Sequence, residues 1–260
     1  MKVTILGCGS STGVPVIGCK CDVCLSDNPK NKRSRVSLLI ETHGKKLLID
    51  SSPDLRAQAL RHGIDCIDAL LYTHEHADHT HGLDDLRSFN YLSDKAIPIY
   101  CDKKTYDSIS SKFSYAFLEK PPVWFRPCLS ANILEEGASG SFDVLGIPVT
   151  YFKQLHGKTT SLGYRIGNFA YSTDTDGLEP SAFEALSGVK VWVVDCLRYT
   201  PSLTHASLPM TLEWIQRVKP ELAILTHMAH EFDYDRLSNE LPPGVAVGND
   251  GMAIEMTEPA

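Results

Sequence analysis

The sequence lacks any long apolar run. Across its 260 residues no stretch approaches the ~20 consecutive apolar residues that a membrane-spanning helix needs. The opening segment, residues 1–7, has a brief apolar stretch that ends at a glycine and is too short for a secretory signal. We therefore expect no membrane partner and a cytoplasmic location.

The chain also lacks an excess of positive charge. Its 25 lysine and arginine residues against 32 aspartate and glutamate residues give a formal net charge of −7. That balance disfavours non-specific binding to nucleic acid or to an anionic membrane surface. Hydrophobic residues at 43% and charged residues at 22% are ordinary for a globular protein with a sizeable core. We expect a small-molecule substrate and no large nucleic acid partner, while a homodimer stays open.

A disulfide scaffold is absent as well. Eight cysteines in a chain of this length fit thiols kept reduced by their compartment. Three of them, Cys19, Cys21 and Cys24, lie within six residues. Cysteines this close together are more typical of a metal site than of bridges.

No repeat, low-complexity tract or linker interrupts the sequence, so we expect a single domain over residues 1–260. Short apolar runs predict strands at residues 3–6, 37–40, 46–49, 69–72, 97–100, 149–152, 162–166, 169–171, 189–194, 222–225 and 253–256. Helices are expected at residues 54–61, 83–90, 103–113, 180–186, 208–218 and 234–239. Early strands follow one another closely enough for hairpins, whereas later strands are separated by helices. This mixture predicts an α/β sandwich with sheets inside and helices outside.

Two features of this pattern carry local expectations. Ser52 and Ser207 are expected N-caps, each followed by a proline at the start of a helix. Residues 114–140 form the least regular segment of the chain. A long irregular segment inside a compact domain is often functional, and a lid and a dimer contact are both open interpretations.

The most informative motif is THEHADH at residues 73–79, directly after the apolar run at 69–72. Sites in α/β structures gather beyond the carboxyl ends of strands. The motif packs His74, His76, Asp78 and His79 into six positions, and imidazole and carboxylate groups suit zinc, manganese or iron. A polar surface turn with chance histidines is the alternative, but three of the ten histidines within six positions disfavour it.

This motif resembles the signature of the metallo-β-lactamase superfamily, whose fold is a four-layer αβ/βα sandwich. The resemblance implies further ligands downstream, and His156, Asp174 and His227 follow predicted strands in that order. A lone histidine beside a strand is usually a structural residue, but an ordered set is stronger evidence. By resemblance, one metal is held by His74, His76 and His156, the second by Asp78, His79 and His227, with Asp174 bridging the two. Two such cations activate a water for attack. We interpret His81, just past the motif, as a surface or supporting residue.

A second metal site is implied by the cysteines. Three thiolates need a fourth ligand in a structural zinc site, and His230, three residues after His227, is the best candidate. The combination of Cys19, Cys21, Cys24 and His230 resembles the PhnP-like cyclic phosphodiesterases, in which a distal structural zinc has this ligand set. The zinc would staple the loop of residues 7–24 to the loop that carries His227; three reduced surface cysteines are the alternative.

The same N-terminal loop is rich in glycine. Its glycines do not match a dinucleotide-binding fingerprint, because one residue too many precedes Gly13. We expect the loop instead to bring backbone N–H groups to the metal cleft.

The PhnP-like branch also implies a histidine that contacts phosphate and protonates the leaving oxygen. His205, just ahead of a predicted helix, is the candidate general acid, and we add Asp78 as a second catalytic candidate. A plain histidine at a helix start is the alternative. Lys158 and Arg198 are candidates for a second phosphate contact, although both are equally suited to the solvent-exposed surface.

The sequence therefore predicts a dinuclear metal-dependent hydrolase acting on a small phosphodiester, cyclic or nucleotide-like. The catalytic metals are zinc or manganese, with iron also open, and one structural zinc is expected. Another hydrolase of the same fold, acting on a thioester or lactam or at RNA 3′ ends, is the first alternative. The acidic balance and the lack of a glycine- and lysine-rich insertion count against RNA. A non-enzymatic metal- or redox-responsive protein is the second alternative.

Overall fold

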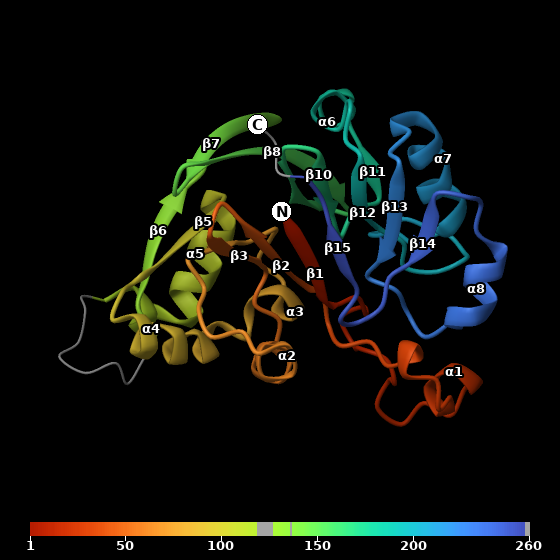
Figure 1. Ribbon diagram of the computed structural model, residues 1–260, viewed down its shortest axis with the longest axis horizontal. Helices are drawn as coiled ribbons and strands as arrows, with labels where there is room; N and C mark the ends of the chain where they lie inside the picture. Colours follow the sequence, from red (N-terminus) through yellow and green to blue (C-terminus); the bar gives the residue numbers. More distant parts are fainter. Residues whose placement is uncertain (119–126, 136, 258–260) are drawn as a thin grey trace. The chain divides into compact units, whose positions relative to one another are not determined.

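The computed structural model describes residues 1–118, 127–135 and 137–257. The chain divides into two compact units. Unit 1 consists of Met1–Gly7, Arg35–Glu136 and Ala253–Glu258, and unit 2 contains Cys8–Ser34 and Gly137–Met252. Each unit is built on one mixed sheet (Figure 1).

Unit 1 contains a seven-stranded sheet. In spatial order its strands are β15 (Ala253–Glu255), β1 (Lys2–Gly7), β2 (Ser37–Thr42), β3 (Lys45–Ile49), β4 (Ala69–Leu71), β5 (Ile97–Cys101) and β6 (Leu129–Ile133). The pairs from β15 to β3 are antiparallel, and those from β3 to β6 are parallel. The predicted hairpin is β2–β3, which closes through a two-residue turn with positive φ at His43 and Gly44, as a tight hairpin requires.

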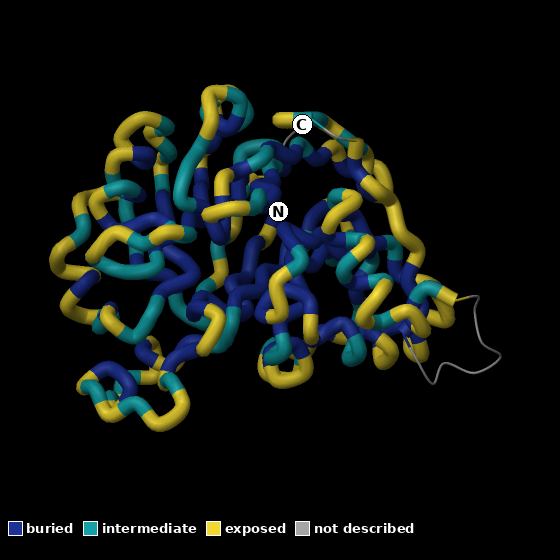
Figure 2. Tube along the Cα trace, turned by 180° about the vertical axis from the view of Figure 1, so that it is seen from behind, coloured by how far each residue is buried: buried dark blue, intermediate teal, exposed yellow. Residues whose placement is uncertain are grey.

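Helices of unit 1 cover one face of this sheet. They are α2 (Leu55–His62), α3 (Ala77–Thr80), η2 (Leu83–Leu86), α4 (Arg87–Ser93), α5 (Lys103–Lys112) and η3 (Ser114–Phe117). Their buried side chains, such as Leu55, Phe89 and Ile109, form one cluster with alternate strand residues such as Leu48 and Leu70. Burial of these apolar side chains is the main stabilisation of the unit, and Figure 2 shows buried residues in dark blue along the chain.

Unit 2 contains an eight-stranded sheet. In spatial order its strands are β11 (Gly177–Leu178), β8 (Ile147–His156), β9 (Thr159–Ile166), β10 (Phe169–Ser172), β12 (Val191–Asp195), β13 (Leu222–Thr226) and β14 (Val245–Val247), with β7 (Ser139–Val144) paired to β8. The helices are α1 (Asp22–Leu25), η1 (Pro29–Asn31), α6 (Pro180–Ala185), α7 (Leu208–Val218) and α8 (Tyr234–Glu240).

Strand direction in unit 2 gathers several strand ends at one edge. Strands β10, β12, β13 and β14 are mutually parallel. Strand β8 runs in the same direction as β10, because both are antiparallel to β9. The carboxyl ends of β8, β10, β12 and β13 therefore lie on the same side of the sheet, which is where side chains for a site collect.

Several local predictions need correction. Ser52 is not an N-cap: α2 begins at Leu55 after Asp54, whose carboxylate instead bonds Arg35. Ser207 does precede α7, but its side chain makes no capping hydrogen bond. The predicted helix at residues 83–90 is a 3-10 turn followed by α4.

The segment expected to be irregular, residues 114–140, is partly regular. It contains η3 and β6, and β7 begins at Ser139. Residues 119–126 and 136 of this segment lie outside the described residues. Strands β6 and β7 contain mostly small and polar residues and few large apolar ones. The alternation of apolar residues is therefore weak in both, and the sequence did not predict them as strands. The short strands β11 and β14 were missed for their length.

Among the described residues, no helix is both long and apolar enough to cross a membrane.

Candidate metal centres and active site

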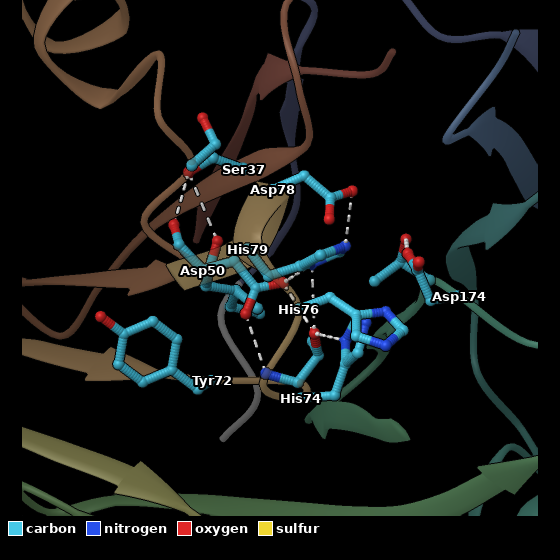
Figure 3. A network of polar contacts seen from close by, with 12 residues as sticks. Ser37, Asp50, Tyr72, His74, His76, Asp78, His79 and Asp174 are labelled. Carbon is cyan, nitrogen blue, oxygen red and sulfur yellow. Dashed lines mark hydrogen bonds and ion pairs between the residues drawn. The ribbon is translucent and has the colours of Figure 1, made fainter. Parts of the chain in front are cut away.

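In unit 1, polar residues follow two neighbouring parallel strands. Asp50 comes directly after β3, and Thr73 comes shortly after β4. The Asp50 carboxylate accepts hydrogen bonds from the backbone N–H and the hydroxyl of Thr73, both at 2.8 Å. It also lies 2.7 Å from Nδ1 of His79 (Figure 3). One buried carboxylate thus ties the strand end to the histidine motif.

The motif residues gather around His74. The ring centroid of His74 lies 4.5 Å from that of His76 and 4.2 Å from that of His79. The short helix α3 begins after His76, and the His79 N–H donates to the His76 carbonyl at 3.1 Å. A carboxylate oxygen of Asp78 lies 3.4 Å from Nε2 of His79. Unit 1 therefore brings together all four ligands expected from its motif.

The contact with Asp50 fixes which atom His79 offers. A neutral imidazole that donates Nδ1–H to a carboxylate carries its lone pair on Nε2, the pattern of metal-binding histidines with an acidic partner. Burial raises the pKa of Asp50, an effect that the nearby His79 opposes. The side chains of Asp50 and His79 are both completely buried, so their mutual contact compensates part of the cost of burying polar groups.

Unit 2 carries a second cluster at the edge where its strands end. His156 ends β8, Asp174 follows β10, and His227 follows β13. Nε2 of His156 lies 3.8 Å from one oxygen of Asp174, and Nε2 of His227 lies 3.4 Å from the other. Nδ1 of His156 contacts the Thr204 carbonyl at 2.6 Å, so the ring presents Nε2 toward Asp174. The two predicted histidine ligands therefore meet at the carboxylate of the third, Asp174.

His205 belongs to the same cluster. Its ring stacks on that of His227 with centroids 4.6 Å apart and an interplanar angle of 11°. It meets the His156 ring edge-on at 4.9 Å. Nε2 of His205 lies 3.8 Å from Asp174, and the side chain is 13% exposed. The candidate general acid is thus beside the predicted ligands of unit 2 and still reachable from solvent.

Two carboxylates of these clusters were missed in the sequence, Asp50 and Asp195. Asp195 ends β12 and lies 3.4 Å from Nδ1 of His205 and 3.7 Å from Nδ1 of His227. Both aspartates come at the carboxyl end of an apolar predicted strand. The signal used for Asp174 would therefore have found them.

Three residues of the clusters have left-handed backbone. The φ angles are 60° at Asp50, 53° at Asp174 and 57° at His227. Each lies in the residue or two after a strand, where the chain turns sharply. Aspartate and histidine are among the side chains that tolerate this region best, and such conformations concentrate at functional sites.

The third cluster, in unit 2, contains the predicted structural zinc ligands. The ligand atoms of Cys19, Cys21, Cys24 and His230 all lie within 4.8 Å of one another. Nδ1 of His230 is 3.5 Å from the Cys19 sulfur and 3.3 Å from the Cys21 sulfur. The contact with His230 lowers the pKa of Cys21 to about 6, whereas burial raises that of Cys24 to about 11. Three sulfurs and one imidazole nitrogen are the donor set of a closed zinc site.

A buried arginine joins this cysteine loop to the loop of His230. Arg33 is 1% exposed, and its guanidinium donates to the Phe232 carbonyl at 2.7 Å and to the Asn31 side chain at 3.3 Å. Its backbone pairs with Val14 in both directions at 2.8 Å. The two loops are therefore connected independently of any metal.

The expectation for the glycine-rich loop is wrong in detail. The N–H groups of Gly9, Ser10 and Gly13 donate to the carbonyls of Ser34, Met228 and Ser10 respectively, so they are engaged within unit 2 rather than directed to a cleft. Gly9 is required for a different reason: a Cβ there would lie 2.7 Å from the Arg33 carbonyl oxygen.

The three remaining candidates behave differently. The Arg198 guanidinium donates to the carbonyls of Thr200 and Pro201 at 3.3 and 2.9 Å and so supports its own loop. Lys158 is exposed. His81 is exposed and packs edge-on against Phe113 with centroids 5.5 Å apart, in keeping with its interpretation as a surface residue.

The donor sets of the two histidine clusters fit divalent cations. Each cluster combines imidazole nitrogens with carboxylate oxygens, which suits zinc, manganese or iron. In each, a buried aspartate faces an Nδ1 atom and orients Nε2 toward the cluster. This is the supporting arrangement typical of metal-binding histidines.

Comparison with known proteins defines the family. A family model described as a beta-lactamase superfamily domain matches residues 45–228. A protein of Porphyromonas gingivalis named octanoyltransferase is 37% identical over 99% of this chain. The chain covers 52% of that protein and so spans about half of its length. A coenzyme PQQ synthesis protein B of Methylobacterium nodulans is 28% identical, with 79% of this chain and 69% of the relative covered.

Solved structures agree with this. A crystal structure described as a new diphosphatase from the PhnP family superposes with a TM-score of 0.91 at 33% identity, covering 99% of this chain and 98% of the other. Zinc-bound PqqB from Methylobacterium extorquens has the same fold, with a TM-score of 0.79 at 19% identity over 98% of this chain and all of the other. The chain belongs to the metallo-β-lactamase superfamily of metal-dependent hydrolases. Within that superfamily it is PhnP-like, which confirms the predicted family and fold class.

Proposed function

We propose that this protein hydrolyses a small phosphodiester, cyclic or nucleotide-like, with the help of two divalent cations. As the superfamily resemblance implies, one cation would be held by His74, His76 and His156 and the other by Asp78, His79 and His227, and Asp174 would serve both. When bound, two such cations lower the pKa of a water molecule and offset charge on the phosphoryl oxygens.

The observation that carries this proposal is the position of His205. The His205 imidazole, which is outside the two expected ligand sets, lies beside Asp174 and stacks on His227, and it keeps some access to solvent. An imidazole is well matched to proton transfer near neutral pH. A hydrolase that expels an alkoxide needs such a donor next to its cations.

The proton balance assigns a role to each nitrogen of His205. Nδ1 faces Asp195 at 3.4 Å and Nε2 faces Asp174 at 3.8 Å. As the water oxygen bonds to phosphorus, the water loses one proton to solvent. The bond to the departing oxygen breaks, and that oxygen takes the Nε2 proton of the His205 imidazolium. The products are a phosphate monoester and an alcohol, and solvent then returns a proton to His205.

The third cluster, of three cysteines and His230, has a structural role in this proposal. Cys19, Cys21, Cys24 and His230 hold one zinc ion, and His230 is only three residues from His227. A zinc ion there holds the loop that carries His227. The similarity to the PhnP-family diphosphatase supports phosphorus chemistry and adds one substrate type, the P–O–P anhydride bond of a diphosphate.

Leaving-group dependence tests the proposal most directly. The full chain, loaded with Mn²⁺ or Zn²⁺, is assayed with bis(4-nitrophenyl) phosphate, with cyclic nucleotides and with substituted diphosphates. Replacement His205→Gln should reduce kcat for alkoxide leaving groups by ~100-fold or more, the usual contribution of a general acid. The loss should be much smaller with 4-nitrophenolate, which departs without protonation. Equal losses for both leaving groups would exclude His205 as the acid.

Acyl transfer is the second candidate, and the relative named octanoyltransferase is the observation that favours it. Hydrolysis of an octanoyl thioester, measured as thiol release under the same conditions, separates the two functions. We expect the phosphodiester to be hydrolysed faster. A thioester turned over more efficiently than every phosphodiester and diphosphate would replace the proposed substrate class.

A further inference from the structure

Asp195 connects more elements of the unit 2 cluster than any side chain described so far. It is the last residue of β12, and its side chain is completely buried. One carboxylate oxygen, Oδ2, lies 3.4 Å from Nδ1 of His205, and the other, Oδ1, lies 3.7 Å from Nδ1 of His227. A single carboxylate therefore faces the same ring atom of two different histidines.

The backbone holds this carboxylate in place. Its Oδ2 accepts the N–H of Thr175 at 3.2 Å and the N–H of Ala206 at 3.1 Å. Thr175 follows Asp174, and Ala206 follows His205. The Asp195 carbonyl accepts the hydroxyl of Thr211, on α7, at 2.7 Å. The position of Asp195 is thus fixed by the two segments that carry the groups it faces and by the adjoining helix.

Buried carboxylates are costly unless they are compensated. Two backbone N–H groups that donate to Oδ2 compensate part of this cost. The Nδ1 atoms of the two imidazoles lie next to the carboxylate oxygens and can compensate the rest. At 3.4 and 3.7 Å these contacts are electrostatic rather than hydrogen bonds of standard geometry, and the carboxylate charge favours the tautomer whose N–H points toward it. The His205 and His227 rings stack at 11°, and both direct Nδ1 toward this group.

We infer that Asp195 is a positioning residue that fixes the Nδ1–H tautomer of His205 and His227 together. In this tautomer both rings present the Nε2 lone pair on the Asp174 side, where His227 would bind a cation and His205 would take up the proton that it donates as an imidazolium. The inference rests on the proposed function for its consequences in catalysis. The tautomers themselves can be observed in the metal-free protein, whether or not it hydrolyses a phosphodiester.

The informative change is Asp195→Asn. Asparagine has the same size and can still accept the two backbone N–H bonds through its carbonyl oxygen. Its NH2 group then faces an imidazole Nδ1 and favours a lone pair there, which moves the proton to Nε2. Loss of the correct tautomer by this route is known to reduce kcat by ~10⁴-fold in serine proteases.

The experiment measures ring tautomers by ¹H–¹⁵N NMR of the full chain with labelled histidine, at about pH 8 where free imidazole is neutral. Spectra of His205→Gln and His227→Asn assign the two rings. We expect Nδ1–H signals for both rings in the unchanged protein. In Asp195→Asn we expect loss of the His227 signal, because the NH2 group replaces Oδ1, whereas His205 faces the retained carbonyl oxygen and keeps its signal. We also expect a ~10–100-fold weaker affinity for Zn²⁺ at the histidine clusters, the usual effect of losing an acidic partner.

Asp250→Asn is the matched control. Asp250 is a half-buried carboxylate in the turn after β14 and also accepts backbone N–H groups, from Cys8 at 3.2 Å and Ser34 at 2.8 Å. It further accepts from the Cys8 thiol at 3.6 Å and from the Ser34 hydroxyl at 2.6 Å. This variant should change thermal stability while leaving both tautomers and the Zn²⁺ affinity unaltered.

Unchanged tautomers in Asp195→Asn, with only a lower melting temperature, would overturn the inference and leave Asp195 as a structural residue. If Asp195→Asn does not fold, Asp195→Glu takes its place, because it retains an acceptor for Nδ1–H. Folded Asp195→Glu should keep both Nδ1–H signals, and loss of them would also overturn the inference. If instead the tautomers shift as expected but the unchanged protein hydrolyses no phosphodiester, only the proposed function fails.

Discussion

The two histidine clusters are built from very different stretches of sequence. The cluster of unit 1 comes from one segment, residues 74–79, which passes from a strand end into a single helical turn. The cluster of unit 2 takes His156, Asp174, His205 and His227 from four separate segments. The first is therefore local, and the second depends on a sheet that aligns three strand ends and on the loop before α7.

Despite this difference the two clusters share one structural feature, which we call the device: an aspartate that supports a histidine ring. In each, a buried aspartate at the end of a strand faces Nδ1 of a histidine: Asp50 faces His79, and Asp195 faces His205 and His227. Asp50 has one imidazole partner at 2.7 Å, whereas Asp195 has two at longer distances. The comparison teaches that support for the rings is built by the sheet in both units, even where the ligands themselves are local in sequence.

The largest expected effect comes from removing one ligand in each unit. His76→Ala and His227→Asn should each strongly reduce kcat/KM for a phosphodiester, because a cation then loses a direct ligand. The loss should exceed the ~10–100-fold that is typical when a residue supporting a metal ligand is removed. Metal content measured on the purified variants should still show the zinc of the cysteine cluster. Full activity in either variant would mean that its unit does not contribute to the catalytic centre.

The next effect concerns the support of the unit 1 cluster. Asp50→Asn should weaken Zn²⁺ affinity by ~10–100-fold, since His79 loses the acceptor for Nδ1–H. Titration calorimetry measures the affinity, and Asp54→Asn is the control within the same unit, because Asp54 pairs with Arg35 rather than with a histidine. If both variants bind Zn²⁺ like the unchanged protein, the two units do not share the device.

A smaller effect is expected from the cysteine cluster. Cys21 and His230 line an open cavity of about 700 Å³, so a chelator has access to this site. Cys21→Ser should lower the melting temperature by ~5–10 °C, which corresponds to ~3 kcal/mol in a chain of this size. Differential scanning calorimetry measures the change. Cys66→Ser, outside the cluster, should cause little change, and an equal loss in both would argue against a bound zinc.

The smallest effect is the pH dependence of a pair in unit 1. Burial alone would raise the pKa of Asp54, but hydrogen bonds from the Arg35 side chain and backbone outweigh it, so the pKa is lowered. A carboxylate with a lowered pKa stabilises the fold above its unfolded pKa of ~3.9, and this is lost as the pH falls through the folded pKa.

Asp54→Asn should therefore cost ~1 kcal/mol of unfolding free energy at neutral pH, a value typical of a partly buried pair. Urea unfolding at a series of pH values should show the difference between the two proteins shrinking under acid conditions. A difference that grows as the pH falls would contradict the assignment.

Much of the fold was predictable because apolar runs mark buried strands. All eleven predicted strands correspond to strands of the two sheets, with ends shifted by a few residues. The weakly apolar β6 and β7 and the very short β11 and β14 were not predictable, because periodicity carries little signal in such segments. The N-cap expected at Ser52 failed because Pro53 and Asp54 form a turn before the helix starts.

The site, like the fold, was predictable from the sequence only in part. His74 to His79 could be identified from spacing alone, whereas His156, Asp174 and His227 needed the resemblance to suggest that separate strand ends cooperate. Asp50 and Asp195 carry the same signal as Asp174, an aspartate at the end of a predicted strand, but they were missed because the resemblance did not direct attention to them. Their role depends on which imidazole the sheet places opposite them, and this is a property of strand order rather than of local sequence.

The left-handed backbone at Asp50, Asp174 and His227 has a consequence for anyone who randomises these positions. Most side chains pay ~1–2 kcal/mol to adopt that conformation, and glycine and asparagine do so most readily. A saturation library selected only for folding should therefore return Gly and Asn at all three sites, and deplete Val and Ile. Alanine scanning there would mix a backbone penalty with a missing functional group, whereas asparagine scanning would separate them.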